Sequence, residues 1–134
     1  MISRPRFISD KSLSKGRREQ MMDARFLRNE MLWGKEGQAR LARAHVILFG
    51  LGGVGSYVAE CLARSGIGEL TLVDGDTVAL SNLNRQLEAL SSTIGLPKAE
   101  AVARRIAEIN PEAVLHPMQA LYNADNRALF FPEG

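Results

Sequence analysis

The chain has 134 residues, of which 46% are hydrophobic and 24% charged, and this length and composition are those of one ordinary globular domain. With 12 Gly and 5 Pro it falls outside the collagen-like, low-complexity and fully disordered classes. The net charge of +2 is uneven, because residues 1–28 carry 8 basic and 3 acidic side chains while the remainder carries 9 and 12.

The amino-terminal part of the chain divides into two segments. Residues 1–22 are polar and basic without sustained apolar periodicity, which predicts an arm without regular structure. Such an arm is more often a solvated tail than a nucleic-acid contact, and both readings stay open. Apolar residues such as Phe26 and Met31 predict a helical segment over residues 23–44, broken near Gly34.

A strand, a glycine-rich turn, a helix and a second strand follow within about thirty residues. The apolar run 46–49 predicts a strand buried on both faces. Helical spacing over 54–64, with Gly66 as a C-cap, predicts the helix, and residues 70–73 predict the next strand, closed by Asp74. Parallel strands joined in this way need a right-handed crossover.

The rest of the chain predicts a second unit of the same kind. Pro97 suits the first residue of a helix that ends near Asn110. A third strand is expected over Ala113–His116 and a short helix over Ala124–Phe131. Residues 45–134 are therefore expected to form an α/β, Rossmann-like parallel sheet with helices on both faces, of which only the first βαβαβ half is present.

Three glycines after the first strand match the G-x-G-x-x-G pattern, namely Gly50, Gly52 and Gly55. The first permits a tight turn, the second lets a phosphate approach the backbone, and the third lets the helix pack closely on the strand. Asp74 ends the next strand, where an acid commonly binds ribose hydroxyls. These residues indicate a nucleotide, although turn geometry alone is the simpler alternative, and they leave the nucleotide's identity open.

Asn82, Arg85 and Lys98 favour a triphosphate over a dinucleotide. They supply an amide, a guanidinium and an ammonium that would neutralise the charge of phosphoryl transfer. Lys98 is the most informative, because a cation at the start of a helix opposes the helix dipole unless an anion lies nearby. Each residue also has a structural explanation as a turn or surface residue.

Four motifs occur in a fixed order: Gly50-Leu-Gly-Gly-Val-Gly-Ser56, Asp74-Gly-Asp76, Ser81-Asn-Leu-Asn-Arg-Gln86 and Gly95-Leu-Pro-Lys98. Together they resemble the ubiquitin-activating-enzyme-like (ThiF/MoeB-type) adenylating superfamily. Further residues are most similar to its bacterial tRNA threonylcarbamoyladenosine dehydratase branch: Arg25-Phe-Leu-Arg28, Gly34-Lys-Glu-Gly37, Ala63-Arg-Ser-Gly-Ile-Gly68, Asn84 and Ile109-Asn-Pro111. The resemblance covers about residues 25–131.

The resemblance implies an ATP site and a role for each matching residue. Asp74 would hold the ribose and Asp76 would line the site, while Arg28 would reach into the neighbouring subunit of a homodimer. The nucleotide-binding set that it implies comprises Gly50, Gly52, Gly53, Gly55, Ser56, Asp74, Asp76, Asn82, Arg85 and Lys98, and the catalytic set comprises Arg85, Lys98 and Arg28.

The implied reaction transfers AMP from ATP to a carboxylate, so that a poor leaving group is replaced by a good one. In the dehydratases this carboxylate belongs to threonylcarbamoyladenosine in tRNA, and a ring closes with loss of water. Relatives that adenylate the tail of a sulfur-carrier or ubiquitin-like protein form the alternative, and a sulfur-relay protein is a further candidate partner. An NAD-binding oxidoreductase fragment and a non-catalytic nucleotide-binding module also remain open.

The carboxyl end departs from the family pattern. In the family the next strand carries an aspartate that binds Mg²⁺, so we expect this cofactor's ligand beyond the present carboxyl terminus and no metal site within this chain. A half sheet leaves the 46–49 strand as an open edge. We therefore expect an incomplete gene product that is inactive alone, or a partner that supplies the other half.

Cysteine and hydropathy patterns bear on location. A lone Cys61 forms no internal disulfide and is expected to be a small packed side chain rather than a nucleophile. The longest uncharged stretch, 44–59, has 16 residues and four glycines, which is too short for a membrane span of ~20 apolar residues. No secretory signal is apparent, so a cytoplasmic protein is expected.

Overall fold

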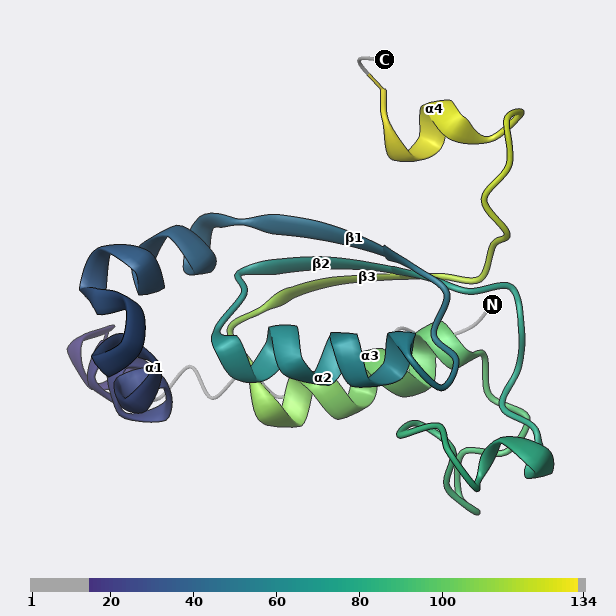
Figure 1. Ribbon diagram of the computed structural model, residues 1–134, viewed down its shortest axis with the longest axis horizontal. Coiled ribbons are helices and arrows are strands. Elements are labelled where there is room, and N and C mark those ends of the chain that lie inside the picture. The colour runs from purple at the N-terminus through teal and green to yellow at the C-terminus, as the bar shows by residue number, and fades with distance from the viewer. Residues whose placement is uncertain (1–14, 133–134) are drawn as a thin grey trace.

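The computed structural model describes residues 15–132, with side chains from residue 24 onward. Helices and strands alternate along the chain (Figure 1). In order they are α1 (Lys15–Arg43), β1 (His45–Phe49), α2 (Gly55–Ser65), β2 (Glu69–Val73), the 3₁₀ helix η1 (Leu80–Asn82), α3 (Lys98–Ile109), β3 (Val114–Met118) and α4 (Arg127–Phe130).

The three strands form one parallel sheet in the order β1-β2-β3. His45 pairs with Glu69, which pairs with Val114, so the strands start in register. Right-handed crossovers place both connecting helices, α2 and α3, on the same face of the sheet (Figure 1). The predicted α/β, Rossmann-like parallel sheet is confirmed. Within the described residues its two connecting helices lie on one face and not on both as expected, because two crossovers of the same hand run in the same direction along the sheet.

The core lies between this sheet and its two helices. It consists of side chains from the central strand, from α2 and from α3, with Leu70, Leu72 and Ile106 among the largest that are fully buried. Residues of β1 are only partly buried, in contrast to the expectation of a strand buried on both faces, because β1 is an edge strand. The alternate residues Val46 and Leu48 pack against the core.

The boundaries of the terminal elements differ from their prediction. α1 already begins at Lys15, so part of the segment expected to lack regular structure is helical, while residues 1–14 lie outside the described range. The break expected near Gly34 is present as a kink, where Gly34 has φ 73°. β3 extends to Met118, and the last helix is shorter than expected.

The last described segment folds over the carboxyl end of the sheet. Phe49 at the end of β1 lies 4.8 Å from Tyr122 and 5.2 Å from Phe130, ring centroid to ring centroid. These aromatic contacts place α4 at that end of the sheet (Figure 1). Among the described residues no helix has both the length and the apolar character needed to cross a membrane.

Candidate functional site

The turn between β1 and α2 is tight at both ends and open in the middle. Gly50 has φ 86°, and its N–H donates to the carbonyl of Val73 over 2.8 Å. A Cβ on Gly55 would lie 1.8 Å from the carbonyl oxygen of Gly50, so only glycine fits there. A Cβ on Gly52 would meet nothing nearer than 3.8 Å. The backbone at Gly52 is therefore the accessible part of the turn.

Asp74 ties this turn to the end of β2. One carboxylate oxygen accepts the N–H of Leu51 over 2.7 Å, and the other accepts the N–H of Asp76 over 2.8 Å. Both oxygens keep a lone pair, so a ribose hydroxyl still has an acceptor. The structural bonds add a role for Asp74 that the sequence pattern did not predict.

A backbone bridge brings the 95–98 segment beside the end of β2. Val78 donates to the carbonyl of Leu96 and receives at its own carbonyl the N–H of Gly95, both over 2.8 Å. Lys98 therefore starts α3 next to Asp76, and its ammonium donates to the Asp76 carboxylate over 3.3 Å. Lys98 is only 6% exposed.

The intervening loop carries the other two predicted phosphate ligands. The Asn82 side chain is buried, and its Oδ1 accepts the N–H of Ala79 over 2.8 Å, which makes it a loop-shaping residue as well as a candidate ligand. Arg85 is exposed and lies against Gly53, with Cδ 3.6 Å from the position of a Cβ there. Its Nη1 donates to the carbonyl of Ser81 and to Oδ1 of Asn84, so three further guanidinium donors remain.

Two predicted site residues lie apart from this group. Ser56 is 2% exposed, and its hydroxyl oxygen accepts the N–H of Leu87 over 3.3 Å, so the side chain faces the loop behind the glycine turn. Arg28 is exposed on α1, between Phe26, which packs at Gly66, and Asn29, which donates to Arg64. α1 lies at the amino end of the sheet, so a single chain does not bring Arg28 to the turn (Figure 1).

Sequence patterns missed two buried polar residues beside the site. Glu88 is 2% exposed and Gln86 is 7% exposed. Both carboxylate oxygens of Glu88 and Oε1 of Gln86 lack a hydrogen-bond partner among the described residues. Burial raises the pKa of Glu88 above its usual value, partly offset by the positive charge of Lys98. No motif indicates them, because a loop carboxylate and a loop amide are normally solvated.

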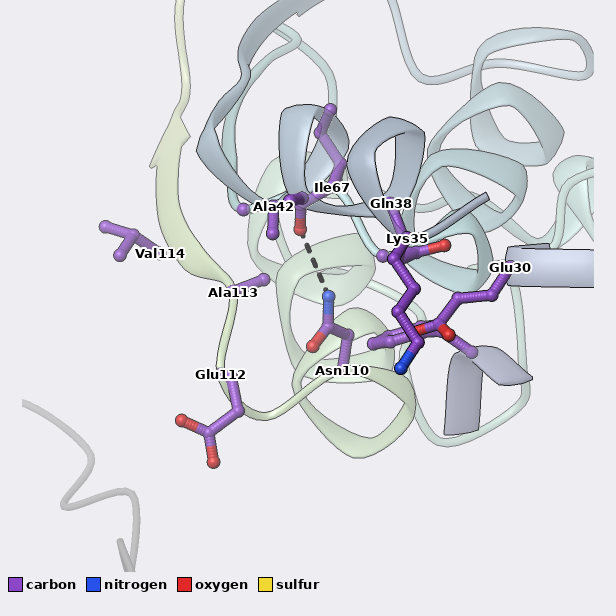
Figure 2. Close-up of a pocket in the computed structure, with 13 residues that line it drawn as sticks. Glu30, Lys35, Gln38, Ala42, Ile67, Asn110, Glu112, Ala113 and Val114 are labelled. Atoms are coloured by element: carbon purple, nitrogen blue, oxygen red, sulfur yellow. Dashed lines mark hydrogen bonds between the residues drawn. The ribbon is translucent and has the colours of Figure 1, made fainter. Parts of the chain in front are cut away.

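A pocket of about 450 Å³ lies at the opposite, amino end of the sheet (Figure 2). Glu30, Lys35 and Glu112 stand around it, and Asn110 joins its wall to the α2–β2 turn by donating to the carbonyl of Ile67 over 3.1 Å. Asn110 Oδ1 has no partner but is itself sealed from solvent. Nucleotides bind at the carboxyl ends of parallel strands, so this pocket is distinct from the candidate site.

The prediction that Cys61 is a packed side chain is wrong, because Cys61 is exposed on the outer face of α2. That face is not covered by any part of the described chain, and Val54, Tyr57 and Val58 are exposed on it as well. Within the described residues, no group of three or more His, Cys, Asp or Glu could hold a metal ion.

The arrangement at the carboxyl end is suited to an anion that carries a ribose. The start of α2, the Arg85 guanidinium and the Lys98 ammonium are positive, while Asp74 offers hydrogen-bond acceptors. Cations at this position stabilise phosphate charge and its increase during transfer.

Comparison with known proteins gives related sequences and folds. The sequence profile of the ThiF family matches residues 26–133. The tRNA threonylcarbamoyladenosine dehydratase of Bacillus subtilis (strain 168) is 48% identical over 109 residues, which are 81% of this chain and 43% of that protein. The molybdopterin-synthase adenylyltransferase of Salmonella typhimurium is 43% identical over 90 residues, or 67% of this chain and 36% of that protein.

Solved structures agree with these relatives. The crystal structure of Escherichia coli tRNA N6-threonylcarbamoyladenosine dehydratase, TcdA, in complex with ATP matches with a TM-score of 0.80 and 43% identity, over 84% of this chain and 46% of that one. A complex of the same enzyme with AMP matches equally well, with a TM-score of 0.80. The chain spans less than half the length of the curated relatives it matches.

Proposed function

The chain belongs to the ThiF family, and from this premise we propose that it binds ATP at the carboxyl end of its sheet for the adenylation of a carboxylate. The observation that carries the proposal is Lys98, an ammonium only 6% exposed beside a glycine turn whose backbone is open at Gly52. A buried cation next to an accessible helix start is a site for an anion. The relatives' ATP and AMP complexes support the same ligand.

The chemistry follows from the leaving group. A carboxylate oxygen attacks the α-phosphorus of ATP and pyrophosphate departs, which leaves an acyl-AMP whose AMP group leaves readily. Lys98 and Arg85 would hold the phosphates and stabilise the charge that develops on them. Asp74 would accept hydrogen bonds from the ribose, while the glycine turn would place the phosphates at the start of α2.

We propose threonylcarbamoyladenosine in tRNA as the acceptor, because the dehydratases are among the most similar relatives, at 48% identity for the Bacillus subtilis enzyme. Sulfur-carrier protein tails are the alternative, because molybdopterin-synthase adenylyltransferases match at 43%. ATP–pyrophosphate exchange in the presence of each acceptor, measured once the further strands of the acceptor site are supplied, separates the two. A homodimer in which Arg28 reaches the neighbouring site, a sulfur-relay partner and a cytoplasmic location belong to the same proposal.

Mg²⁺ is part of the proposal only as a companion of ATP. The described residues do not gather a set of metal ligands, so no step is assigned to the ion. Because the described sheet has three strands and an open β1 edge, we expect this chain alone to bind ATP without completing the reaction. The acceptor site would then need further strands.

Calorimetric titration with ATP and with NAD tests the nucleotide. We expect tighter binding of ATP, and we expect Lys98→Ala to weaken it by roughly tenfold, since a charge-assisted hydrogen bond is lost. Arg104→Ala is the matched control, because Arg104 is an exposed cation on the same helix, paired with Glu100. It should leave the affinity within about twofold of the parent.

Tighter binding of NAD than of ATP would overturn the adenylation proposal in favour of an oxidoreductase fragment. An ATP affinity that is equal in the parent and in Lys98→Ala would also contradict it. Thermal melts of both variants show whether a loss of affinity reflects a loss of folded protein.

A further inference from the structure

Glu88 is the least satisfied buried group near the site. Its side chain is 2% exposed, and neither carboxylate oxygen has a hydrogen-bond partner among the described residues. Its backbone is well held, because the Thr93 hydroxyl donates to the Glu88 carbonyl over 2.6 Å. A buried carboxylate without partners destabilises the fold in its ionised form, so Glu88 lowers stability unless it has another use.

The charged and polar groups around Glu88 are those of the candidate site. Burial is the largest cause and raises the pKa of Glu88, while its own backbone N–H and then the positive charge of Lys98 at the start of α3 lower it. Asp74 at the end of β2 raises the pKa and the Ser56 hydroxyl at the start of α2 lowers it, both less strongly. A hollow on the outer side of the loop is lined by Glu88 together with Arg64, Arg104, Arg105 and Glu108.

Those outer groups are largely occupied with each other. Arg64 and Arg105 both pair with Glu60, and Arg104 pairs with Glu100. Ala89, the residue after Glu88, packs against Ala101, one turn along α3 from Lys98, so Glu88 lies beside the start of that helix. Of the cations of the candidate site, Lys98 is the one whose charge acts on Glu88. At present its ammonium donates to Asp76, whose carboxylate is 73% exposed and so a weak competitor.

We propose that Glu88 is a positioning residue of the nucleotide site that acts through Lys98. In its neutral form the carboxyl leaves the Lys98 ammonium to the ligand phosphates, and in its ionised form it retains the ammonium and repels the phosphates. The inference rests on the proposed function, since it assigns Lys98 to phosphates. It adds that nucleotide binding is coupled to protonation of one buried acid.

The coupling has a definite sign. Phosphates beside Lys98 add negative charge near Glu88 and engage the cation that lowers its pKa, so bound ATP favours the neutral carboxyl and raises its pKa further. By linkage, protonation of Glu88 strengthens ATP binding to the same extent. Nucleotide affinity should therefore fall as pH rises through the pKa of Glu88 in the free protein.

Calorimetry with the whole chain tests this, using ATP at several values from about pH 4.5, the usual pKa of a glutamate, up to about pH 9 in buffers of different ionisation enthalpy. The parent should take up a fraction of a proton on binding and lose about three- to tenfold more affinity over this range than Glu88→Gln. Glu88→Gln should show none of the extra proton uptake. The ligand's own titration cancels in the comparison between the two proteins.

Two further variants locate the effect. Glu112→Gln is the matched control, because it makes the same chemical change at an exposed position at the amino end of the sheet, and it should behave like the parent. In a Lys98→Ala background, Glu88→Gln should leave the pH profile almost unchanged, since the residue through which it acts is gone. An equal effect in both backgrounds would contradict action through Lys98.

The outcomes separate the two proposals. ATP binding with the same pH profile and proton uptake in the parent and in Glu88→Gln overturns the role of Glu88 and leaves the proposed function intact. Absence of ATP binding in every protein overturns both. If Glu88 were purely structural, Glu88→Gln would change the pH dependence of the unfolding free energy without changing proton uptake on ATP binding. Urea denaturation of the nucleotide-free proteins measures that unfolding free energy.

Discussion

Gly55 and Gly52 belong to the same turn but differ in the space around their Cα atoms, and this difference separates their roles. A side chain on Gly55 would overlap the Gly50 carbonyl, with a Cβ at 1.8 Å, whereas one on Gly52 would find its nearest neighbour, Gln86 Nε2, at 3.8 Å. The first glycine is therefore required by the fold. The second is free for a ligand.

Gly55→Ala should lower the free energy of unfolding by about 3 kcal/mol or more, because the helix must move away from the strand. Urea denaturation measures this loss. Gly52→Ala is the control and should cost less than about 1 kcal/mol while weakening ATP binding. Similar losses of stability in the two variants would contradict the geometry of the turn.

Residue patterns predicted the glycine turn and Asp74 because their requirements are local. The burial of Glu88 could not be predicted in this way. It arises because the Thr77–Pro97 bridge closes the loop on itself, and that bridge joins residues far apart in sequence. Cys61 was placed wrongly for the related reason that helical spacing identifies a possible core position but not whether anything covers it.

Among the elements, α2 and α3 are joined by one ion pair that crosses between helices. Arg105 on α3 donates through two nitrogens to the carboxylate of Glu60 on α2, and Arg64 binds the same carboxylate. The hydrogen bond from Arg105 is the main cause that lowers the pKa of Glu60. By contrast, Arg104 pairs with Glu100 one turn away on its own helix.

Arg105→Gln should lower the free energy of unfolding by about 1 kcal/mol at neutral pH, while Arg104→Gln should change it by less than about 0.5 kcal/mol. A lowered folded-state pKa means that the contribution of Glu60 is present above its unfolded pKa of about 4.5 and is lost as pH falls through the folded value. Urea denaturation at neutral and at acidic pH should show the Arg105→Gln effect shrinking in acid. An effect that is constant with pH would assign it to packing.

The elements also show where sequence reasoning holds. Continuous apolar runs, helical spacing, a glycine C-cap and Pro97 predicted α2, α3 and the three strands, because each pattern reports a local preference of its own segment. The length of α1 and the partial exposure of β1 depend on what lies beside them. The residues of a single segment do not show which other elements will pack beside it.

At the scale of the whole molecule, one side of the sheet is incomplete within the described chain. β1 is an edge strand, and beside it the outer face of α2 exposes Val54, Tyr57, Val58 and Cys61. We call this region the apolar flank. A strand edge without Pro or Lys and a bare apolar helix face favour association with another surface.

We therefore expect the isolated chain to self-associate as its concentration rises, and we expect Tyr57→Lys to reduce this. Tyr57 is 51% exposed, so the substitution removes no core contact. Val114→Lys is the control, because Val114 is 52% exposed on β3, the opposite edge strand of the sheet. Light scattering after size exclusion measures both. Equal reduction by the two variants would point to added charge rather than to the flank.

The bridge between Thr77 and Pro97 also gives the two cations that we propose to hold phosphates different structural settings. Lys98 stands at the base of the closed loop, on the first residue of a helix whose inner face, with Ala99, Val102 and Ile106, is packed in the core. Arg85 lies within the loop itself, and its guanidinium is held by hydrogen bonds to the nearby residues Ser81 and Asn84. A change in the loop would thus move the guanidinium and leave the ammonium in place, so that capture of a nucleotide and its release can be governed by different residues.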